Sequence, residues 1–490
     1  PAGARIYLGP CKATAAAGLD VSKLPFNAFI IRLTDAGFFL IGDDSEGPVP
    51  ATEMTTRAGT LFAVYEFLEK QLGVRWLWPG DMGTFAPKRD TIIVASWDQV
   101  HRPHQLNTCV RAHMEKYNKE DSKGFSSIEA YGRYKREEEA WLTRHRMSMP
   151  QSASASHAPK SYAYWQRFGA TGTHLEYFAL LNTGKRETMR GNESGSRVTW
   201  CVSQPKLWDQ VVADWVEYKD PSGNVTRRAD TNDFVQAGEN DCPGLCMCEA
   251  CRAWDEPDPR FATHPYWNGT LKRPLTLADR ALFWGHDSAE ASPSLSGRYA
   301  KFWMKVLERA KKVRPDARLA TFAYANTYEA PKQTKLHPDV WVRVVAPFGY
   351  PFTEKKLSSY EANWQAWAAT GATLVHRPNY MLCGHNMPLY FAGALARNLR
   401  FVFQHNCRET DFDSLLGAFA NQGPTLYTLV RLHVRPEMTG EQVLDEYYAI
   451  FGAAKDKVRA YFDHWRDVCG DFKSETLGKE VHETDGAGYE

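Results

Sequence analysis

The sequence carries no excess charge of either sign and no long apolar run. Its 490 residues include 59 Lys and Arg against 58 Asp and Glu, a net charge of +1. This balance gives no electrostatic reason to expect nucleic acid or an anionic membrane surface as a partner. No apolar run approaches the roughly 18–20 residues that cross a bilayer. We therefore expect no nucleic-acid partner and no membrane span, and the sequence leaves the oligomeric state open.

Cysteine is too sparse for a disulfide scaffold, with ten residues in the chain, but four of them fall close together. These are Cys242, Cys246, Cys248 and Cys251. Four thiolates from one short loop can surround a zinc ion tetrahedrally. Cys246 and Cys248 are too close for an easy mutual disulfide. The spacing favours a structural zinc site that clamps its loop, with disulfides or packed free thiols as alternatives. We expect no cofactor for catalysis.

Aromatic residues are abundant: 16 Trp, 22 Tyr and 25 Phe. A large core accounts for most of them. Others lie beside Gly, Pro, Asn and His in expected loops, as at residues 348–351 and 377–380. Rings beside polar groups suit a concave site for a small molecule, and sugar faces stack well on such rings.

Residues 1–98 are predicted to form a small α/β domain. Strand-like runs cover residues 4–9, 28–33 and 37–42, and a helix with apolar positions at 61, 64, 65 and 68 covers residues 55–70. A closing strand is expected at residues 91–95. This order, with Leu-Gly-Val-Arg-Trp at residues 72–76, resembles the N-terminal domain of family 67 α-glucuronidases. The resemblance implies an accessory domain.

Residues 99–424 are predicted to form a (β/α)8 barrel, because strand-like runs alternate there with amphipathic helices. The expected strands lie at residues 106–110, 144–149, 199–202, 233–238, 319–325, 340–345, 372–375 and 400–403. Residues 425–490 are expected to be a helical extension that ends in a polar tail. The fold class is therefore α/β, with a barrel between two smaller parts.

The fourth expected strand ends at Gly238 and is followed directly by Glu239, Asn240 and Asp241. Barrel enzymes place catalytic groups at the carboxyl ends of their strands. A glycosidase needs one carboxyl with a raised pKa and a second group at the anomeric centre. We predict that Glu239 or Asp241 is catalytic. The structural alternative is that Asp241 caps a turn and Glu239 pairs with an arginine.

The sequence does not identify the second catalytic carboxylate. Glu329, in the loop after the fifth strand, is the third catalytic candidate, and Asp411 and Asp413 are expected after the eighth. Each of these could instead be a loop cap or a member of a salt bridge. The predicted substrate contacts all lie in or beside loops that follow expected strands: Asn240, Tyr324, Asn326, Tyr328, Arg377, Asn379, Tyr380, His385, Asp411, Asp413 and His157.

Three motifs carry a second resemblance, over about residues 105–465. They are His-Leu-Glu-Tyr-Phe at residues 174–178, Gly-Lys-Arg at residues 184–186, and Asn-Asp at residues 240–241, followed by Cys-x-Cys-x-x-Cys. Together they resemble the domain-of-unknown-function 4838 family, whose characterised branch is glycoside hydrolase family 163. That branch cleaves β-linked N-acetylglucosamine within complex N-glycans. The resemblance implies a glycosidase-like barrel with an oligosaccharide or polysaccharide substrate.

The expected function is hydrolysis of a glycosidic bond in a complex glycan at an N-acetylhexosamine. Carboxylates would supply acid and base, or the substrate's own N-acetyl group would assist. One alternative is an exo-glycosidase on uronic-acid polysaccharide, with Arg377 and Arg408 meeting the carboxylate. Another is a glycan-binding protein without activity. We expect the protein outside the cytoplasm, with a signal peptide removed before Pro1.

Overall fold

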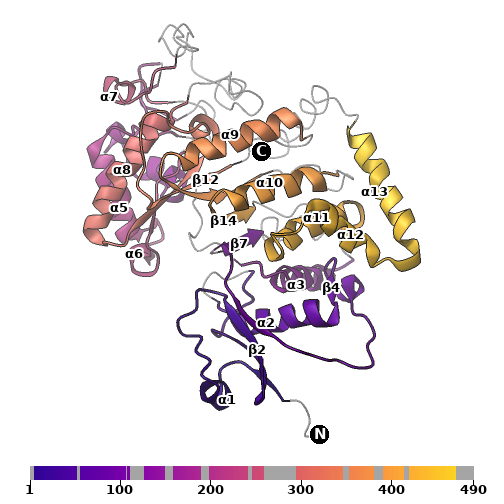
Figure 1. The fold of residues 1–490 in the computed structure, drawn as a ribbon. Helices are drawn as coiled ribbons and strands as arrows, with labels where there is room; N and C mark the ends of the chain where they lie inside the picture. The colour runs from indigo at the N-terminus through magenta and orange to yellow at the C-terminus, as the bar shows by residue number, and fades with distance from the viewer. Residues whose placement is uncertain are drawn as a thin grey trace.

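Two larger β-sheets and the helices around them organise the described residues, which also include two short two-stranded sheets (Figure 1). The structure is a computed structural model. It describes residues 5–51, 56–105, 107–110, 126–148, 158–181, 183–188, 198–240, 245–258, 294–345, 352–379, 390–412 and 419–470. One sheet is mixed and lies near the N-terminus, and the other is parallel. The predicted domain limits remain predictions.

The N-terminal sheet has the strand order β1-β3-β2-β6. Its strands are β1 (Ile6–Leu8), β2 (Phe29–Thr34), β3 (Gly37–Gly42) and β6 (Asp98–His101). Helix α2 (Gly59–Phe67) packs on this sheet, within the predicted helix at residues 55–70. A Cβ on Gly42 would lie 2.2 Å from the carbonyl carbon of Gly59, so this close approach requires glycine. The closing strand predicted at residues 91–95 is wrong, because Ile92 and Ile93 are exposed and β6 pairs with β2 instead.

The second sheet is a curled, six-stranded parallel sheet with the order β10-β11-β12-β13-β14-β7. Its strands are β7 (Asn107–Val110), β10 (Phe234–Gln236), β11 (Arg318–Ala323), β12 (Val340–Val344), β13 (Thr373–His376) and β14 (Cys407–Phe412). The first of these strands in sequence pairs with the last, as in a closing barrel. The α/β class and the first, fourth, fifth, sixth and seventh expected strands are confirmed. Five of the eight predicted strands are therefore present among the described residues, and β14, which was not predicted, is the sixth strand of the sheet.

The second and third expected strands are not strands. Helix α3 (Ile128–Arg144) takes up the start of the second, and the chain then turns at Arg146, whose φ is 59°. The amide of Ser148 donates to the carbonyl of Thr108 over 2.6 Å, so this segment runs beside β7 without forming a ladder. In the third, Trp200 makes only an isolated antiparallel bridge with Phe178. Both predictions were wrong because short apolar runs do not distinguish strands from packed loops.

The last expected strand, at residues 400–403, lies inside helix α10 (Ala392–Gln404). Leu395, Leu399 and Val402 are buried at helical spacing, and this periodicity overrides the β propensity of the Phe-Val-Phe run. The true strand, β14, begins three residues after the helix ends. Asp411 therefore lies within the last strand of the sheet and not in a loop beyond it.

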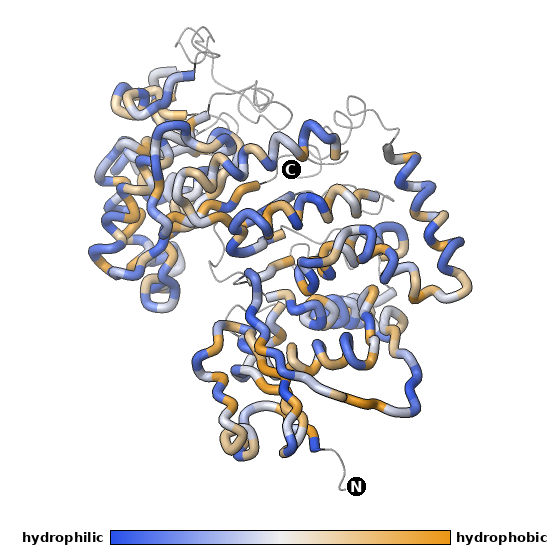
Figure 2. The backbone as a smooth tube through the Cα atoms, viewed as in Figure 1, coloured by the Kyte–Doolittle hydropathy of each residue, from blue (hydrophilic) through white to orange (hydrophobic). Residues whose placement is uncertain are grey.

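Helices pack on the parallel sheet and bury the largest side chains of the core. Those that contact its strands include α5 (Pro205–Val216), α8 (Ser296–Val313), α9 (Glu354–Ala368) and α10. Helices α11 (Phe419–Val434) and α12 (Gly440–Ala449) pack on α10, and α13 (Lys455–Gly470) packs on α12. Figure 2 shows hydrophilic and hydrophobic residues alternating along several of them, the pattern of amphipathic helices. Trp303 and Trp364 are fully buried, and their indole N–H groups donate to the carbonyls of Ala237 and His405. Within the described ranges, no helix is both long and apolar enough to cross a membrane.

Candidate functional site

The register of the parallel sheet places several charged side chains on one face. Phe322, Arg343, Val375 and Glu409 are successive partners across β11 to β14, so their side chains point to the same side. Asp411, two residues beyond Glu409, shares that side. Phe322 and Val375 belong there to an apolar cluster that also contains Phe234, Trp341 and Val345. This face therefore combines aromatic rings with buried charges near the carboxyl edge of the sheet.

Asp411 forms the centre of the charged group. Its Oδ2 lies 3.4 Å from Nε of Arg343 and 4.0 Å from Nε of Arg377. Arg343 and Asp411 are fully buried, whereas the Arg377 side chain is 12% exposed. Arg377 also donates from Nη1 to Oδ1 of Asn379 and lies over the ring of Phe322. Three predicted substrate contacts, Arg377, Asn379 and Asp411, are thus brought together.

Burying an ion pair has a large desolvation cost, so such a pair is weak as a stabilising device. Buried charges at the carboxyl edge of a parallel sheet, where barrel enzymes place their catalytic groups, make this a candidate functional site. In this arrangement the buried Asp411 fixes the guanidinium of Arg377. Arg377 is the member of the group that reaches the surface.

Glu239 follows β10 at the same edge of the sheet and is half-buried. Burial raises the pKa of its carboxyl to about 8, against the opposing effects of a hydrogen bond from the Asn240 amide and the positive charge of Arg298. The Asn240 amide lies 2.7 Å from Oε1 of Glu239. With this pKa, Glu239 is mostly protonated at pH 7 and can donate a proton.

Asn240 is buried, and its side-chain N–H donates to the carbonyl of Val198 over 2.9 Å. The amide predicted to contact a sugar therefore ties the segment at residue 198 to the end of β10. This bond fixes the backbone that carries Glu239.

The loop after β11 divides its predicted residues between two sides of the sheet. Tyr324 packs against the apolar cluster on the charged face. Ala325 has a φ of 48° and begins a short turn, after which Tyr328 packs with the helix-side core. Its carbonyl accepts hydrogen bonds from Asn363 and Trp367. The structure therefore keeps Tyr324 in the candidate site and places Tyr328 in the core.

Asn326 and Glu329 lie in the same turn. Asn326 is buried, and its carbonyl accepts from the amide of Leu295 at 2.7 Å. Glu329 is half-buried, and its carbonyl accepts from the hydroxyl groups of Ser294 and Ser296. These bonds give the backbone of this turn a structural role. The remaining predicted site residues lie outside the described residues: Asp241, Tyr380, His385, Asp413, His157 and Cys242.

Four thiols of the described residues meet in one cluster, and three of them belong to the predicted set. The Sγ atoms of Cys201, Cys246, Cys248 and Cys251 all lie within 4.8 Å of one another. Cys201 is an addition to the prediction, and Cys242, the fourth predicted ligand, lies outside the described residues. Sequence spacing could not identify Cys201, because the fold brings it in from a segment 45 residues before Cys246.

A family model described as a domain of unknown function, DUF4838, matches residues 78–463. The chain belongs to the DUF4838 family. The match includes Glu239, Asp411 and all four clustered cysteines, so both candidate centres lie within the family domain. The family description states no activity, and a search of curated proteins found no match.

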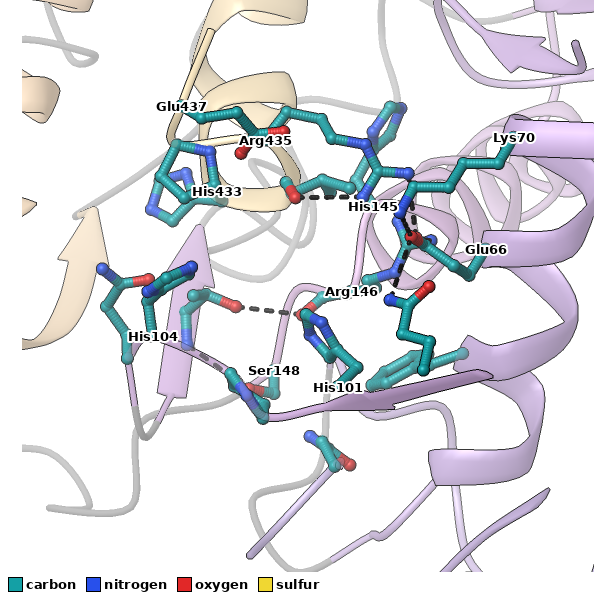
Figure 3. A pocket seen from close by; sticks show the side chains of 18 residues that line it. Glu66, Lys70, His101, His104, His145, Arg146, Ser148, His433, Arg435 and Glu437 are labelled. Atoms are coloured by element: carbon teal, nitrogen blue, oxygen red, sulfur yellow. Dashed lines mark hydrogen bonds and ion pairs between the residues drawn. The ribbon is translucent and has the colours of Figure 1, made fainter. Parts of the chain in front are cut away.

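A cavity of about 180 Å³ lies where the N-terminal sheet meets the DUF4838 region. Its lining includes residues of α2, β6 and β7, and residues that follow α3 and end α11. Figure 3 shows Glu66, Lys70, Arg146 and Arg435 gathered on one side of this cavity, with dashed lines joining them. None of these residues was among the predicted site residues.

Two buried glutamates hold this junction together. Nη2 of Arg146 lies 3.0 Å from Glu66 and 3.2 Å from Glu69, and Nη2 of Arg435 lies 2.8 and 3.0 Å from the same carboxylates. Arg431 pairs with Glu69 at 3.2 Å. Both glutamates precede the DUF4838 match and all three arginines lie within it. The ion cluster therefore joins the N-terminal part of the chain to the family domain.

The positive charge of the arginines determines the pKa values of the two glutamates in this cluster. Burial alone would raise the pKa of both glutamates, but the nearby arginines outweigh it and hold the pKa of Glu66 and of Glu69 at about 2. Burial lowers the pKa of His101, His145 and His433, which line the same cavity, to about 4. At neutral pH the glutamates are therefore charged and the histidines neutral.

We expect acid to destabilise the protein in two stages. Each buried histidine binds fewer protons in the folded than in the unfolded chain between pH 4 and 6.5, so stability falls as the pH drops through this window. The glutamates act in the same direction between pH 4.5 and 2. The loss from pH 7 to pH 4 should reach about 3 kcal/mol for each of the three histidines, measured by urea unfolding at fixed ionic strength.

A matched variant tests the assignment of the first stage. The Nε2–H group of His145 donates to the carbonyl of Trp76 over 2.8 Å, and His145→Gln can keep a donor there without titrating. The slope of stability against pH should become shallower between pH 6.5 and 4 in this variant. An unchanged slope would show that His145 does not contribute to it.

Proposed function

We propose that this DUF4838 protein is a glycoside hydrolase in which Glu239 protonates the leaving oxygen of the glycosidic bond. The observation that supports this most directly is the pKa of Glu239, raised to about 8 by burial at the carboxyl end of β10. A general acid must be protonated at the working pH yet lie within reach of the substrate. The raised pKa keeps Glu239 protonated at pH 7, and its partial exposure supports access by a substrate.

The proposed role of Arg377 is to bind the glycan. Asp411 and Asn379 orient its guanidinium from two sides, and the ring of Phe322 lies 5.6 Å from its central carbon. A guanidinium fixed in this way can donate to sugar hydroxyls or to the oxygen of an acetamido group. Tyr324, on the same face, offers a ring beside it. Asp411 is a positioning residue in this scheme.

The group that acts at the anomeric centre is a separate prediction. Asp241 and Glu329 are the carboxylate candidates, and an N-acetyl group on the substrate is the third. We favour an N-acetylhexosamine substrate, on the resemblance to glycoside hydrolase family 163. Such a substrate supplies its own nucleophile, and a glycan of this kind would place the protein outside the cytoplasm.

The geometry disfavours the uronic-acid alternative in its predicted form. Arg377 follows the carboxyl end of β13, whereas Arg408 is the second residue of β14 and Asp411 is the neighbour of Arg377. Three residues along a strand separate Arg408 from Asp411, roughly 10 Å. A single carboxylate is therefore too small to meet both arginines directly.

A panel of defined glycans tests the proposal. Complex N-glycans, chitin oligosaccharides and uronic-acid oligosaccharides would be incubated with the full chain, and products followed by mass spectrometry and NMR. Cleavage at an N-acetylhexosamine is the expected result. Cleavage only of the uronic-acid set would support the alternative substrate. Binding without turnover across the panel would favour a glycan-binding protein and overturn the proposal.

A further inference from the structure

We propose that Cys201, Cys246, Cys248 and Cys251 bind a structural zinc ion. Three of the four residues are buried and Cys248 is half-buried. Four protein ligands in a closed site leave no position for a catalytic water, so the ion would be structural. The proposal is independent of the proposed hydrolase activity.

The distances between the sulfur atoms fit a tetrahedral metal site. Sγ of Cys201 lies 3.7 Å from Sγ of Cys248 and 3.8 Å from Sγ of Cys251. A tetrahedron with Zn–S bonds of about 2.3 Å has edges of about 3.8 Å. A disulfide would instead bring two sulfur atoms to about 2.05 Å. The cluster has the dimensions of the zinc site and not those of a bonded pair.

Hydrogen-bond donors surround the sulfur atoms, as expected for thiolates. The amide of Leu180 donates to Sγ of Cys246 over 3.3 Å, and the amide of Cys251 donates to Sγ of Cys248 over 3.4 Å. The hydroxyl of Ser203 lies 3.1 Å from Sγ of Cys251. Such contacts orient metal ligands and stabilise their charge.

Two arginines supply the compensating charge. Four thiolates and one Zn²⁺ carry a net charge of −2, which needs positive neighbours in a buried place. Arg186 donates to the carbonyl of Phe178, two residues before Leu180, whose amide contacts Sγ of Cys246. Arg298 is buried and donates from Nη1 to the carbonyl of Cys246 over 2.8 Å. The charge of Arg298 is shared, because it also forms a bidentate pair with Asp255.

The site would clamp several separate segments together. The amide of Met247 donates to the carbonyl of Leu180 over 2.7 Å, and Nη1 of Arg298 donates to the carbonyl of Cys246 over 2.8 Å. Cys201 follows the bridge between Trp200 and Phe178. A zinc ion would bond to cysteines of these segments and so cross-link them. The first of its ligands from this loop among the described residues, Cys246, lies six residues after Asn240.

The test is the metal content of the full chain, purified without a metal-affinity step and with reductant present. Inductively coupled plasma mass spectrometry should find about one zinc per chain in the wild-type protein. Cys201→Ala should lose it. Cys407→Ala, which removes a buried thiol outside the cluster, should keep it. Cys242→Ala should also keep it, which separates this ligand set from four cysteines of one loop.

A second measurement covers the case in which Cys201→Ala does not fold. Wild-type protein titrated with a mercurial thiol reagent should release one zinc as the clustered thiols react. Cobalt exchanged into the site should give the intense sulfur-to-metal absorption of a tetrahedral thiolate complex. Protein without metal, an iron-containing chromophore, or a disulfide between clustered cysteines found by mass spectrometry would overturn the proposal. So would zinc retained in Cys201→Ala and lost in Cys242→Ala.

Discussion

Glu239→Gln is expected to lower kcat/KM on a cleaved glycan by about 10²–10⁴-fold, the usual contribution of a general acid. Glutamine has nearly the same shape and cannot supply a proton. The dissociation constant of the glycan should change little, because the lost step belongs to the transition state. Initial rates and equilibrium binding on the same glycan would measure the two quantities separately.

The dependence of kcat/KM on pH distinguishes a general acid from a residue with a purely structural role. Since burial raises the pKa of Glu239 to about 8, the protonated form declines as the pH rises through this value. The wild-type kcat/KM should therefore fall above about pH 8, and the residual activity of Glu239→Gln should lack this limb. A substrate with an activated leaving group needs less protonation, so the variant should lose less of its rate on it.

Two further variants identify which carboxylate acts. Glu249→Gln makes the same change at an exposed position ten residues later and should keep activity within about twofold. Asp241→Asn tests the neighbouring candidate. If Asp241→Asn alone removed the high-pH limb, the acid would be Asp241. Full activity of Glu239→Gln on unactivated glycans would contradict the assignment of Glu239.

The positions of Glu239 and Arg377 at the edge of the parallel sheet could be predicted from the sequence, because each residue directly follows a strand that its own segment forms. A strand broken by Gly238 and followed at once by Glu239 indicates a carboxylate at the edge of a parallel sheet, and the structure places it there. Arg377 follows β13 in the same way. Asp411 was expected nearby for the wrong reason, since it lies within β14. Its contact with Arg377 follows from the strand register, which no local pattern encodes.

The features that sequence missed depend on contacts between distant segments. Cys201 joins the thiol cluster through the packing of its segment against residues 177–179. From the sequence, Glu66 and Glu69 would be expected on the solvent-exposed face of an amphipathic helix. The spacing of apolar residues in this helix does not reveal that Arg431 and Arg435, more than 360 residues away, pair with these glutamates. Periodicity predicts which helix faces are buried. It does not predict which partner supplies the opposite charge.

Glu69→Gln is expected to destabilise the folded protein by about 3–5 kcal/mol. The carboxylate of Glu69 is buried and pairs with Arg146, Arg431 and Arg435. Removing its charge leaves these guanidiniums facing one another, and Glu66 and Glu446 are the acids that still pair with them among the described residues. A buried charge that loses its partner keeps its full desolvation cost, which is why the loss exceeds that of any surface pair.

The matched control for this prediction is Glu308→Gln on α8. Glu308 pairs with Lys305 and Lys312, but all three side chains are about half exposed or more. Water screens such pairs, so this variant should lose less than about 1 kcal/mol. Urea unfolding of both variants at pH 7, followed by tryptophan fluorescence and circular dichroism, gives the comparison. Equal losses in the two variants would mean that the junction cluster contributes no more than surface charge. A larger loss in Glu69→Gln, accompanied by earlier proteolysis between the N-terminal sheet and the DUF4838 domain, would identify the cluster as the element that holds the two together.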